Sequence, residues 1–343
     1  MNNRVELHVH LDGAIRPSTI FELAGKKGIK LPGASLEDLK AAVEIRELGN
    51  LKKYLEPFLI FMPVISGDPE AIQRIAYEFC EDCSHQGLLY VEARYSPHLL
   101  RESGETEKNA LNSEEVVRLV NEGFTRGEKD FGVKVRSILC CMRHMTGWST
   151  EVLELCQKFK NDGVVGIDIA GSEQLCDEAT HVDHVRVFQE AAKLGICRTV
   201  HAGENGPAGV VREAIEEMHA QRIGHGYHSI DDPDVYKLVK ERNIHLEVCP
   251  YSSYATGSFC GNFKEHPVRS FLLDNVNFSI NTDDPLITGH TLNDEYELCK
   301  NELGMTDGDL AFINLNAAKS SFLPPDEKRE LVDQLEKVYG LKD

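Results

Sequence analysis

The 343-residue sequence predicts an α/β fold, a (β/α)8 TIM barrel, from three observations. Eight short runs rich in β-branched residues recur along the chain, and stretches with helical patterning separate most of them. Parallel strands need crossover connections of this length. Polar residues stand at or just past the ends of the runs, where a barrel gathers its active-site side chains. Eight such units favour a closed barrel over an open sheet.

The expected strands follow one another in order along the chain. The first connection, from Leu11 to Leu88, is the longest and must contain more than one helix. Helical sequence also continues after the last strand as far as Tyr339. No linker interrupts the pattern, so we expect a single domain over residues 1–343. The strands are expected at Val5–Leu11, Leu88–Tyr95, Val133–Met142, Val164–Gly171, Cys197–Glu204, Arg222–Tyr227, Ile244–Pro250 and Val276–Asp283.

The composition argues against several classes of protein. Hydrophobic residues make up 41% of the sequence, which suits a sizeable core and not a disordered chain. The net charge of −19 disfavours nucleic acid and anionic membranes as partners, because both would repel the chain. No apolar run reaches the ~18 residues that a membrane span needs. The polar start, Met1–Leu7, leaves no room for a signal peptide.

Ten cysteines are too sparse in this chain to form a disulfide framework. We interpret them as reduced thiols, and we expect a cytoplasmic, monomeric protein. Cys80 and Cys83 form a C-x-x-C, and His245 and Glu247 form an H-x-E. Zinc deaminases that act on flipped bases carry these motifs in the opposite order, with a proline before the first cysteine. The reversed order here favours two ordinary thiols on a helix over Ile72–Ser84.

His8 and His10 are separated by one residue in a predicted strand. Alternation therefore places both imidazoles on the same side, inside the barrel. Two buried histidines need partners, and either ordinary polar packing or a metal ion would provide them.

His201 and Asp283 end two other predicted strands, and they complete a set of nitrogen and oxygen ligands that suits Zn²⁺. Taken singly, His201 is explained by a hydrogen bond in the core and Asp283 by a helix cap before Pro285. Their joint position at one barrel mouth favours a metal site. Bound zinc would acidify a water molecule and make it a nucleophile.

Glu204 follows His201 by three residues, and Gly203 between them allows a sharp turn of the backbone. A carboxyl group in a closed apolar pocket holds its proton to higher pH and acts as a general acid. The alternative for Glu204 is an ordinary residue in the first turn of a helix. Asp283 and Asp284 diverge on an extended chain, so one can bind a metal while the other contacts a substrate.

Motifs spread over nearly the whole chain resemble those of the adenosine deaminase family, of the kind found in animal cytosol. Each motif is fairly specific, and their order strengthens the match. They are VELHVHLDG at Val5–Gly13, YVEARYSPHLL at Tyr90–Leu100, SILCCMRH at Ser137–His144, HAGE at His201–Glu204, RIGHGY at Arg222–Tyr227, CPYSSYATG at Cys249–Gly257, NTDDP at Asn281–Pro285 and NAAKSSFL at Asn316–Leu323.

The resemblance implies a metal-dependent barrel hydrolase that deaminates adenosine and 2′-deoxyadenosine in purine metabolism, with one Zn²⁺ per chain. Glu204 would protonate N1 of the purine, His225 would hold the attacking hydroxide, and Asp283 would assist. Asp284 would contact N7, the N–H of Gly171 would contact N3, and Asp12 would bind the ribose beside His10. The implied zinc ligands are His8, His10, His201 and Asp283.

The family also implies an apolar flap over the site. Leu51, Tyr54, Leu55 and Phe58 occupy that place with the spacing of one helix face. Such spacing is also typical of an ordinary buried stripe. Tyr54 stands where the family pattern has Phe, and Glu44–Asn50 departs from the vertebrate pattern.

Three other functions are alternatives to the deamination of adenosine. A deaminase of free adenine or of a 6-substituted nucleotide would use the same scaffold, but a carboxylate at Asp12 would repel a 5′-phosphate. No glycine-rich loop or basic cluster near the motifs suits phosphate. A non-catalytic binding protein would be expected to lack Glu204, His225 or a ligand. A generic barrel hydrolase is the least specific alternative.

Overall fold

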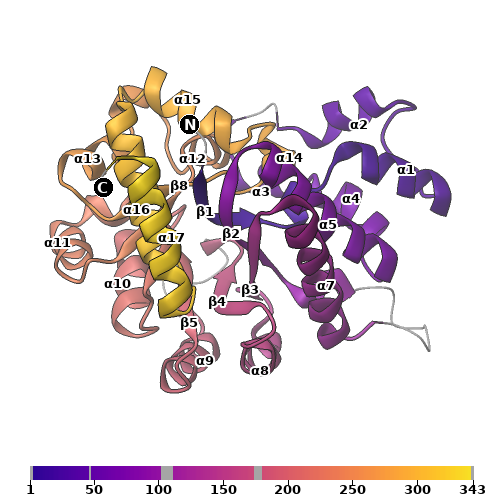
Figure 1. Cartoon of the computed structure of the whole chain (residues 1–343), viewed down its shortest axis with the longest axis horizontal. Coiled ribbons are helices and arrows are strands. Elements are labelled where there is room, and N and C mark those ends of the chain that lie inside the picture. The colour runs from indigo at the N-terminus through magenta and orange to yellow at the C-terminus, as the bar shows by residue number, and fades with distance from the viewer. Residues whose placement is uncertain (1–2, 46–47, 102–110, 174–179, 341–343) are drawn as a thin grey trace.

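A computed structural model describes residues 3–45, 48–101, 111–173 and 180–340 (Figure 1). All eight predicted strands are present, pair in parallel, and neighbour one another in chain order. The predicted barrel is therefore confirmed. The strands are β1 (Arg4–His10), β2 (Leu88–Tyr95), β3 (Lys134–Met142), β4 (Val164–Ala170), β5 (Cys197–Ala202), β6 (Arg222–His225), β7 (His245–Val248) and β8 (Phe278–Ile280).

Backbone hydrogen bonds just past the end of β8 bring the last strand back to the first. The N–H of His10 donates to the carbonyl of Asp283 at 2.8 Å, and the N–H of Asp283 donates to the carbonyl of His8 at 3.1 Å. Val9 and Asp283 thus form a parallel bridge that closes the ring. Closure places the carboxyl ends of the first and last strands side by side.

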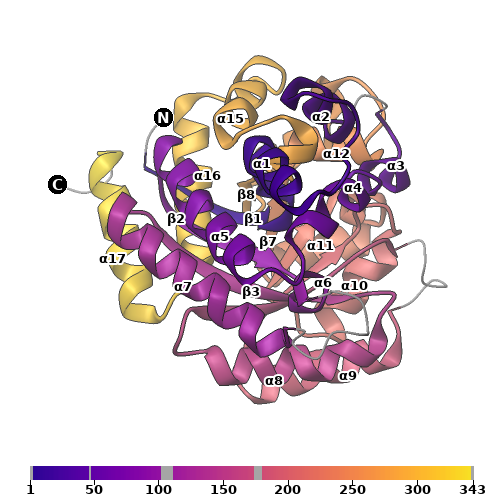
Figure 2. The same cartoon turned by 90° about the vertical axis from the view of Figure 1, so that its right-hand side faces the viewer.

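Helices surround the strands (Figure 2). The first connection holds several helices, as expected: α1 (Pro17–Lys27), α2 (Leu36–Val43), α3 (Leu51–Leu55), α4 (Phe58–Ile65) and α5 (Pro69–His85). The later helices are α6 (Pro97–Arg101), α7 (Ser113–Phe131), α8 (Ser149–Phe159), α9 (Val182–Lys193), α10 (Ala208–Glu216), α11 (Pro233–Glu241), α12 (Pro250–Thr256), α13 (Pro267–Leu273), α14 (Pro285–Thr288), α15 (Leu292–Asn301), α16 (Asp307–Ser320) and α17 (Pro325–Val338). Short 3-10 turns are η1 (Asp12–Ala14), η2 (Thr146–Trp148), η4 (Tyr227–Asp231) and η5 (Phe263–Glu265).

Local sequence explains where these elements begin and end. α7 starts at a capping box formed by Asn112 and Glu115, and Gly132 ends it in the left-handed region. α16 and α17, yellow in Figure 1, follow the last strand and pack together beside β1 and β8. No helix among the described residues is both long and apolar enough to span a membrane.

Several strands end earlier than the sequence predicted. β5 stops at Ala202 and β6 at His225, while β7 stops before Pro250, which begins α12. Gly226 and Asp283 both have a positive φ, which takes the backbone out of the strand conformation. Glu204, Asp283 and Asp284 therefore lie on the turns that follow the strands, whereas His201 and His225 lie near the ends of β5 and β6.

Cys80 and Cys83 lie on α5 and are buried, which confirms that they are core thiols. α5 packs against α7 through glycines on the facing helix. A Cβ atom added at Gly127 would lie 2.4 Å from the Cβ of Cys80, far inside van der Waals contact. This close approach therefore requires glycine.

We predict that Gly127→Ala destabilises the protein, although alanine usually favours a helix over glycine by ~0.5–1 kcal/mol. Overpacking against Cys80 should lower the free energy of unfolding by about 1–3 kcal/mol. Gly25→Ala in α1 is the matched control, because nothing lies within 4 Å of the added Cβ. Urea unfolding would measure both, and an equal gain in stability for the two variants would contradict the packing explanation.

Candidate active site

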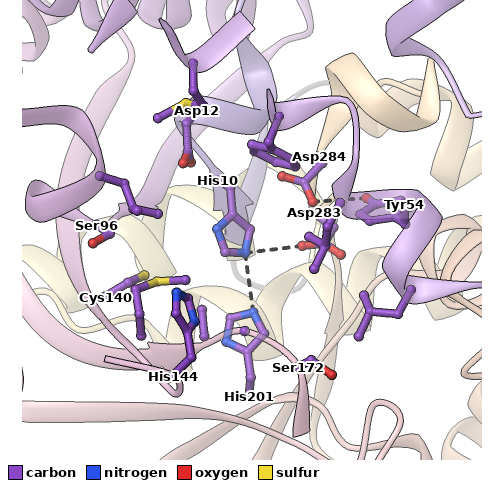
Figure 3. Close-up of a pocket in the computed structure, with 18 of the residues that line it drawn as sticks. His10, Asp12, Tyr54, Ser96, Cys140, His144, Ser172, His201, Asp283 and Asp284 are labelled. Carbon is purple, nitrogen blue, oxygen red and sulfur yellow. Dashed lines mark hydrogen bonds and ion pairs between the residues drawn. The ribbon is translucent and has the colours of Figure 1, made fainter. Parts of the chain in front are cut away.

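A cavity of about 670 Å³ opens at the carboxyl ends of the strands (Figure 3). Its base is polar, and its outer wall comes largely from apolar side chains of α3 and α4. Every predicted site residue except His8 lines it, and His8 lies beneath, fully buried. The lining includes His10, Asp12, Leu51, Tyr54, Leu55, Phe58, Gly171, His201, Glu204, His225, Asp283 and Asp284.

The two histidines of β1 converge on Asp283. His8 Nε2 lies 3.3 Å from Asp283 Oδ1, and His10 Nε2 lies 3.4 Å from the same oxygen. Both imidazoles thus face the barrel interior, as strand alternation predicted. The other oxygen of Asp283 accepts a hydrogen bond of 2.6 Å from Ser252 Oγ, which fixes the carboxylate.

His201 joins this cluster from β5, with its Nε2 3.3 Å from His10 Nε2 (Figure 3). His225 joins from β6, and its ring centroid lies 4.6 Å from that of His8. One donor atom from each of His8, His201, His225 and Asp283 lies within 4.8 Å of the others. The structure therefore brings together the four residues implied as zinc ligands, and it adds His225.

His225 and Asp283 adopt a backbone conformation that is rare outside glycine, with φ of 67° and 68°. Such residues cost of order 1–3 kcal/mol each and persist only where the surrounding structure imposes them. Here the turns follow β6 and β8, and both side chains line the cavity.

The donor set fits a metal ion. Burial lowers the pKa of His10, His201 and His225, which leaves neutral rings with free lone pairs. The pKa of His8 is raised instead: burial and Arg94 lower it, but hydrogen bonds with Asp283 and Glu247 outweigh them. His8 Nε2, which lies 3.3 Å from Asp283 Oδ1, is fully buried. The cluster therefore favours one positive charge, whether a proton or a cation.

Carboxylates behind the cluster orient two of its rings. Glu247 Oε2 lies 2.8 Å from His8 Nδ1, and Asp168 Oδ2 lies 3.0 Å from His201 Nδ1. These contacts turn the Nε2 atoms toward the cavity, as carboxylates commonly do behind metal-binding histidines.

Arg94 from β2 joins the two carboxylates. Its guanidinium lies 2.7 Å from Asp168 and 2.6 Å from Glu247, and all three side chains are fully buried. Neither residue was predicted to belong to the site: Arg94 had no predicted role, and Glu247 was interpreted only as part of an H-x-E pair with His245. Both lie in apolar strands, where a charged residue pointing inward could have signalled a partner.

Glu204 lies above the cluster, and its Oε2 is 3.8 Å from His225 Nε2. Burial, with the charges of Asp283 and Glu173, raises the pKa of Glu204 well above its usual value. Gly203, with φ of 65°, provides the predicted turn before it. The arrangement can therefore supply a proton to a group bound beside the histidines.

Two further carboxyl groups face the cavity. Burial raises the pKa of Asp12 to about 6, and one of its oxygens has no hydrogen-bond partner. Burial and the charge of Asp283 raise the pKa of Asp284 well above its usual value. Asp283 and Asp284 point to different partners, as expected, because Tyr54 donates a 3.0 Å hydrogen bond to Asp284 Oδ2. Gly171 lines the cavity from the end of β4.

The prediction of one continuous flap helix is wrong. Leu51, Tyr54 and Leu55 lie on α3, whereas Phe58 begins α4, because Pro57 has no N–H with which to continue the helical hydrogen bonds. All four side chains still line the cavity. Within the divergent segment Glu44–Asn50, residues 46–47 lie outside the described residues.

Comparisons with known proteins agree on one family. The sequence model described as adenosine deaminase matches residues 3–338. The adenosine deaminase of Xenopus tropicalis is 51% identical and that of Bos taurus is 50% identical, each over 98% of this chain and 96% and 94% of theirs. The crystal structure of an adenine deaminase from Arthrobacter aurescens is 27% identical, has a TM-score of 0.87, and covers 99% of this chain and all of its own.

We predict that Arg94→Met strongly destabilises the protein, because it leaves two buried carboxylates without their cation. The expected loss is about 3–5 kcal/mol in the free energy of unfolding. Arg118→Met is the matched control, since Arg118 pairs with Glu114 on the surface and should contribute under ~1 kcal/mol. Denaturant titration would decide, and similar losses for both variants would show that the interior pair contributes little.

Proposed function

Because the chain belongs to the adenosine deaminase family, we propose that the cavity at the carboxyl ends of the strands is the site where it hydrolyses adenosine to inosine and ammonia. The observation that carries this assignment is that one cavity holds Glu204, a carboxyl group whose pKa is raised well above its usual value, next to a cluster of histidines and Asp283. The two features match the proton donor and the metal site that hydrolytic deamination requires.

We propose that His8, His10, His201 and Asp283 hold one Zn²⁺. Three imidazoles, each of which can offer a lone pair once it carries no extra proton, and one carboxylate are ligands that zinc prefers. Zinc bound there would act as a Lewis acid and lower the pKa of a water molecule in the cavity. Glu247 and Asp168 keep the ligand nitrogens of His8 and His201 directed at that position.

Glu204 carries the proton that the purine needs. It donates to N1, which weakens the N1–C6 double bond and makes C6 electrophilic. Water loses a proton to His225 or Asp283, and its oxygen adds to C6. The exocyclic amine then takes the proton held by His225 or Asp283 and leaves as ammonia, while the hydroxyl proton of the adduct returns to Glu204. N1 keeps its proton in inosine, so the reaction consumes one water.

The remaining cavity groups would orient the nucleoside. Asp284 would contact N7 and the backbone N–H of Gly171 would contact N3, while Asp12, beside His10, would accept a hydrogen bond from a ribose hydroxyl. The pKa of about 6 leaves Asp12 mostly ionised at neutral pH, so it acts as an acceptor.

We propose that α3 and the start of α4 form a flap over the bound purine, through Leu51, Tyr54, Leu55 and Phe58. Leu55 is 38% exposed, whereas Tyr54 is 1% exposed and hydrogen-bonded to Asp284. An apolar cover excludes water and strengthens the electrostatic contacts inside. We also propose that the enzyme acts as a cytosolic monomer, which suits the nine free cysteines among the described residues.

The purified protein should contain one zinc per chain and consume adenosine, measured as loss of its absorbance. A chelator should abolish activity, and added zinc should restore it. His10→Ala should lose both metal and activity, because the site then lacks a ligand. His228→Ala is the control, since His228 pairs with Asp231 outside the cavity. Full activity in protein free of transition metal would rule out this assignment.

Glu204→Gln should retain zinc and bind substrate but lose turnover by roughly 10²–10⁴-fold, because an amide cannot deliver a carboxylic proton. The measurements are kcat, KM and metal content on the same preparation. Near-normal kcat with an intact fold would show that Glu204 is not the acid.

The enzyme should prefer adenosine and 2′-deoxyadenosine over adenine and AMP. Adenine would leave Asp12 unpaired in a closed pocket, at a cost of ~1–3 kcal/mol. The phosphate of AMP would meet the negative charge of Asp12, and no lysine or arginine lies among the described residues that line the cavity. Competition assays would compare kcat/KM for the four substrates. Comparable values for AMP and adenosine would overturn the role of Asp12.

A further inference from the structure

Glu173 occupies an unusual position next to the loop that carries Glu204. Its carboxylate accepts hydrogen bonds from four consecutive backbone N–H groups. Gly203 donates to Oε1 at 2.8 Å, and the next three residues donate to Oε2 at 2.9, 2.9 and 2.8 Å. Glu173 itself is only 6% exposed. A single side chain therefore accepts the hydrogen bonds of all four backbone N–H groups of residues 203–206.

These bonds fix a segment that no strand or helix holds. β5 ends at Ala202 and α10 begins at Ala208, so the N–H groups between them lack partners in regular structure. Charge-assisted bonds from backbone N–H groups to a carboxylate are about twice as strong as neutral ones. Consecutive backbone N–H groups that point at one anion form a concave anion-binding site in the main chain. The loop conformation thus depends on Glu173.

Glu173 also connects two parts of the substrate site. It follows Gly171, which ends the β4 turn, by two residues, whereas Glu204 lies on the β5 turn. In the proposed function these two residues contact N3 and N1, which belong to the same ring of the purine. A rigid link between the two turns would set the distance between the two contacts.

We propose that Glu173 is a positioning residue for proton transfer to N1: it holds the Glu204 loop in register with the Gly171 turn. The proposal rests on the proposed role of Glu204. The Glu204 carboxyl has few partners of its own, a hydrogen bond with Thr256 and the 3.8 Å approach of His225. Its direction therefore follows the backbone beneath it.

The charge of Glu173 has a second effect on the same group. After burial and Asp283, it is the third cause that raises the pKa of Glu204, since a nearby negative charge disfavours ionisation. The residue that fixes the loop therefore also favours the protonated form of the acid.

Glu173→Gln is the direct test. The amide keeps one acceptor oxygen but turns an NH2 group toward backbone donors, so the loop must shift. We expect kcat to fall roughly 10- to 100-fold, because small misplacements of a reacting group have effects of this size. KM should change by less than about threefold and zinc content should not change. Glu213→Gln is the matched control, because the Glu213 carboxylate likewise accepts a hydrogen bond from a backbone N–H, but from that of Thr180, outside the loop.

Two measurements separate positioning from a general loss of structure. In the Glu204→Gln background, Glu173→Gln should add almost nothing, because both changes act on one proton transfer. In the single variant, inhibition by purine riboside, which keeps N1, should weaken by about tenfold or more. Inhibition by 1-deazaadenosine, which lacks N1, should change by less than about threefold.

Additive losses in the double variant, or equal weakening of both inhibitors, would overturn the proposal. If Glu173→Gln does not fold, Gly206→Ala tests the same contact, since its Cβ would lie 3.0 Å from Glu173 Cδ. It should also lower kcat, and an unchanged kcat would count against the proposal. Failure of the proposed function is distinguishable, because Glu204→Gln alone would then retain its turnover.

Discussion

The interior of this barrel depends on the charge balance around Arg94. Ionised carboxylates are needed behind the histidines, yet an unpaired charge in a protein interior carries a large desolvation penalty. Arg94 lies between Asp168 and Glu247 and contacts both. Arg222 pairs with Glu247 from the other side and with Glu92 as well. His201 and Arg94 lower the pKa of Asp168, and Arg94 and Arg222 lower that of Glu247, whereas burial without these partners would favour the protonated forms of both.

The same residues close the barrel and build the site. The backbone of Asp283 bonds to His8 and His10 and so joins the last strand to the first, while its side chain meets the two imidazoles. A change in register between β1 and β8 would therefore break the fold and the ligand cluster together. This coupling explains how a strained backbone is tolerated at Asp283, because hydrogen bonds on both sides impose it.

The sequence predicted much of this arrangement, since each cue was local. Alternation along the strand predicted that His8 and His10 point to the same side. The polar residues that follow the apolar runs predicted which end of the barrel carries the site. Arg94 and Glu247 escaped because their roles depend on contacts between strands far apart in the chain. The break between α3 and α4 could have been predicted from the sequence, because Pro57 lies between the two helices. The bond from Tyr54 to Asp284 could not, because it joins α3 to a residue 230 positions further along the chain.

The cavity gathers four carboxyl groups, and their ionisation divides the site into two functions. Burial raises the pKa of Asp283 as it does the others, but a hydrogen bond with His8 and the nearby His225 reverse the effect, so Asp283 stays ionised. Burial is the largest cause of the raised pKa of Glu204 and of Asp284, and the charge of Asp283 raises both further. In the proposed function, the charge of Asp283 would face the metal ion beside the histidines, while Glu204 and Asp284 would donate protons toward the purine. The acceptors N1 and N7 lie on the edge of the base that carries the reacting amine, so neutral carboxyl groups can bind that edge where ionised ones would repel it.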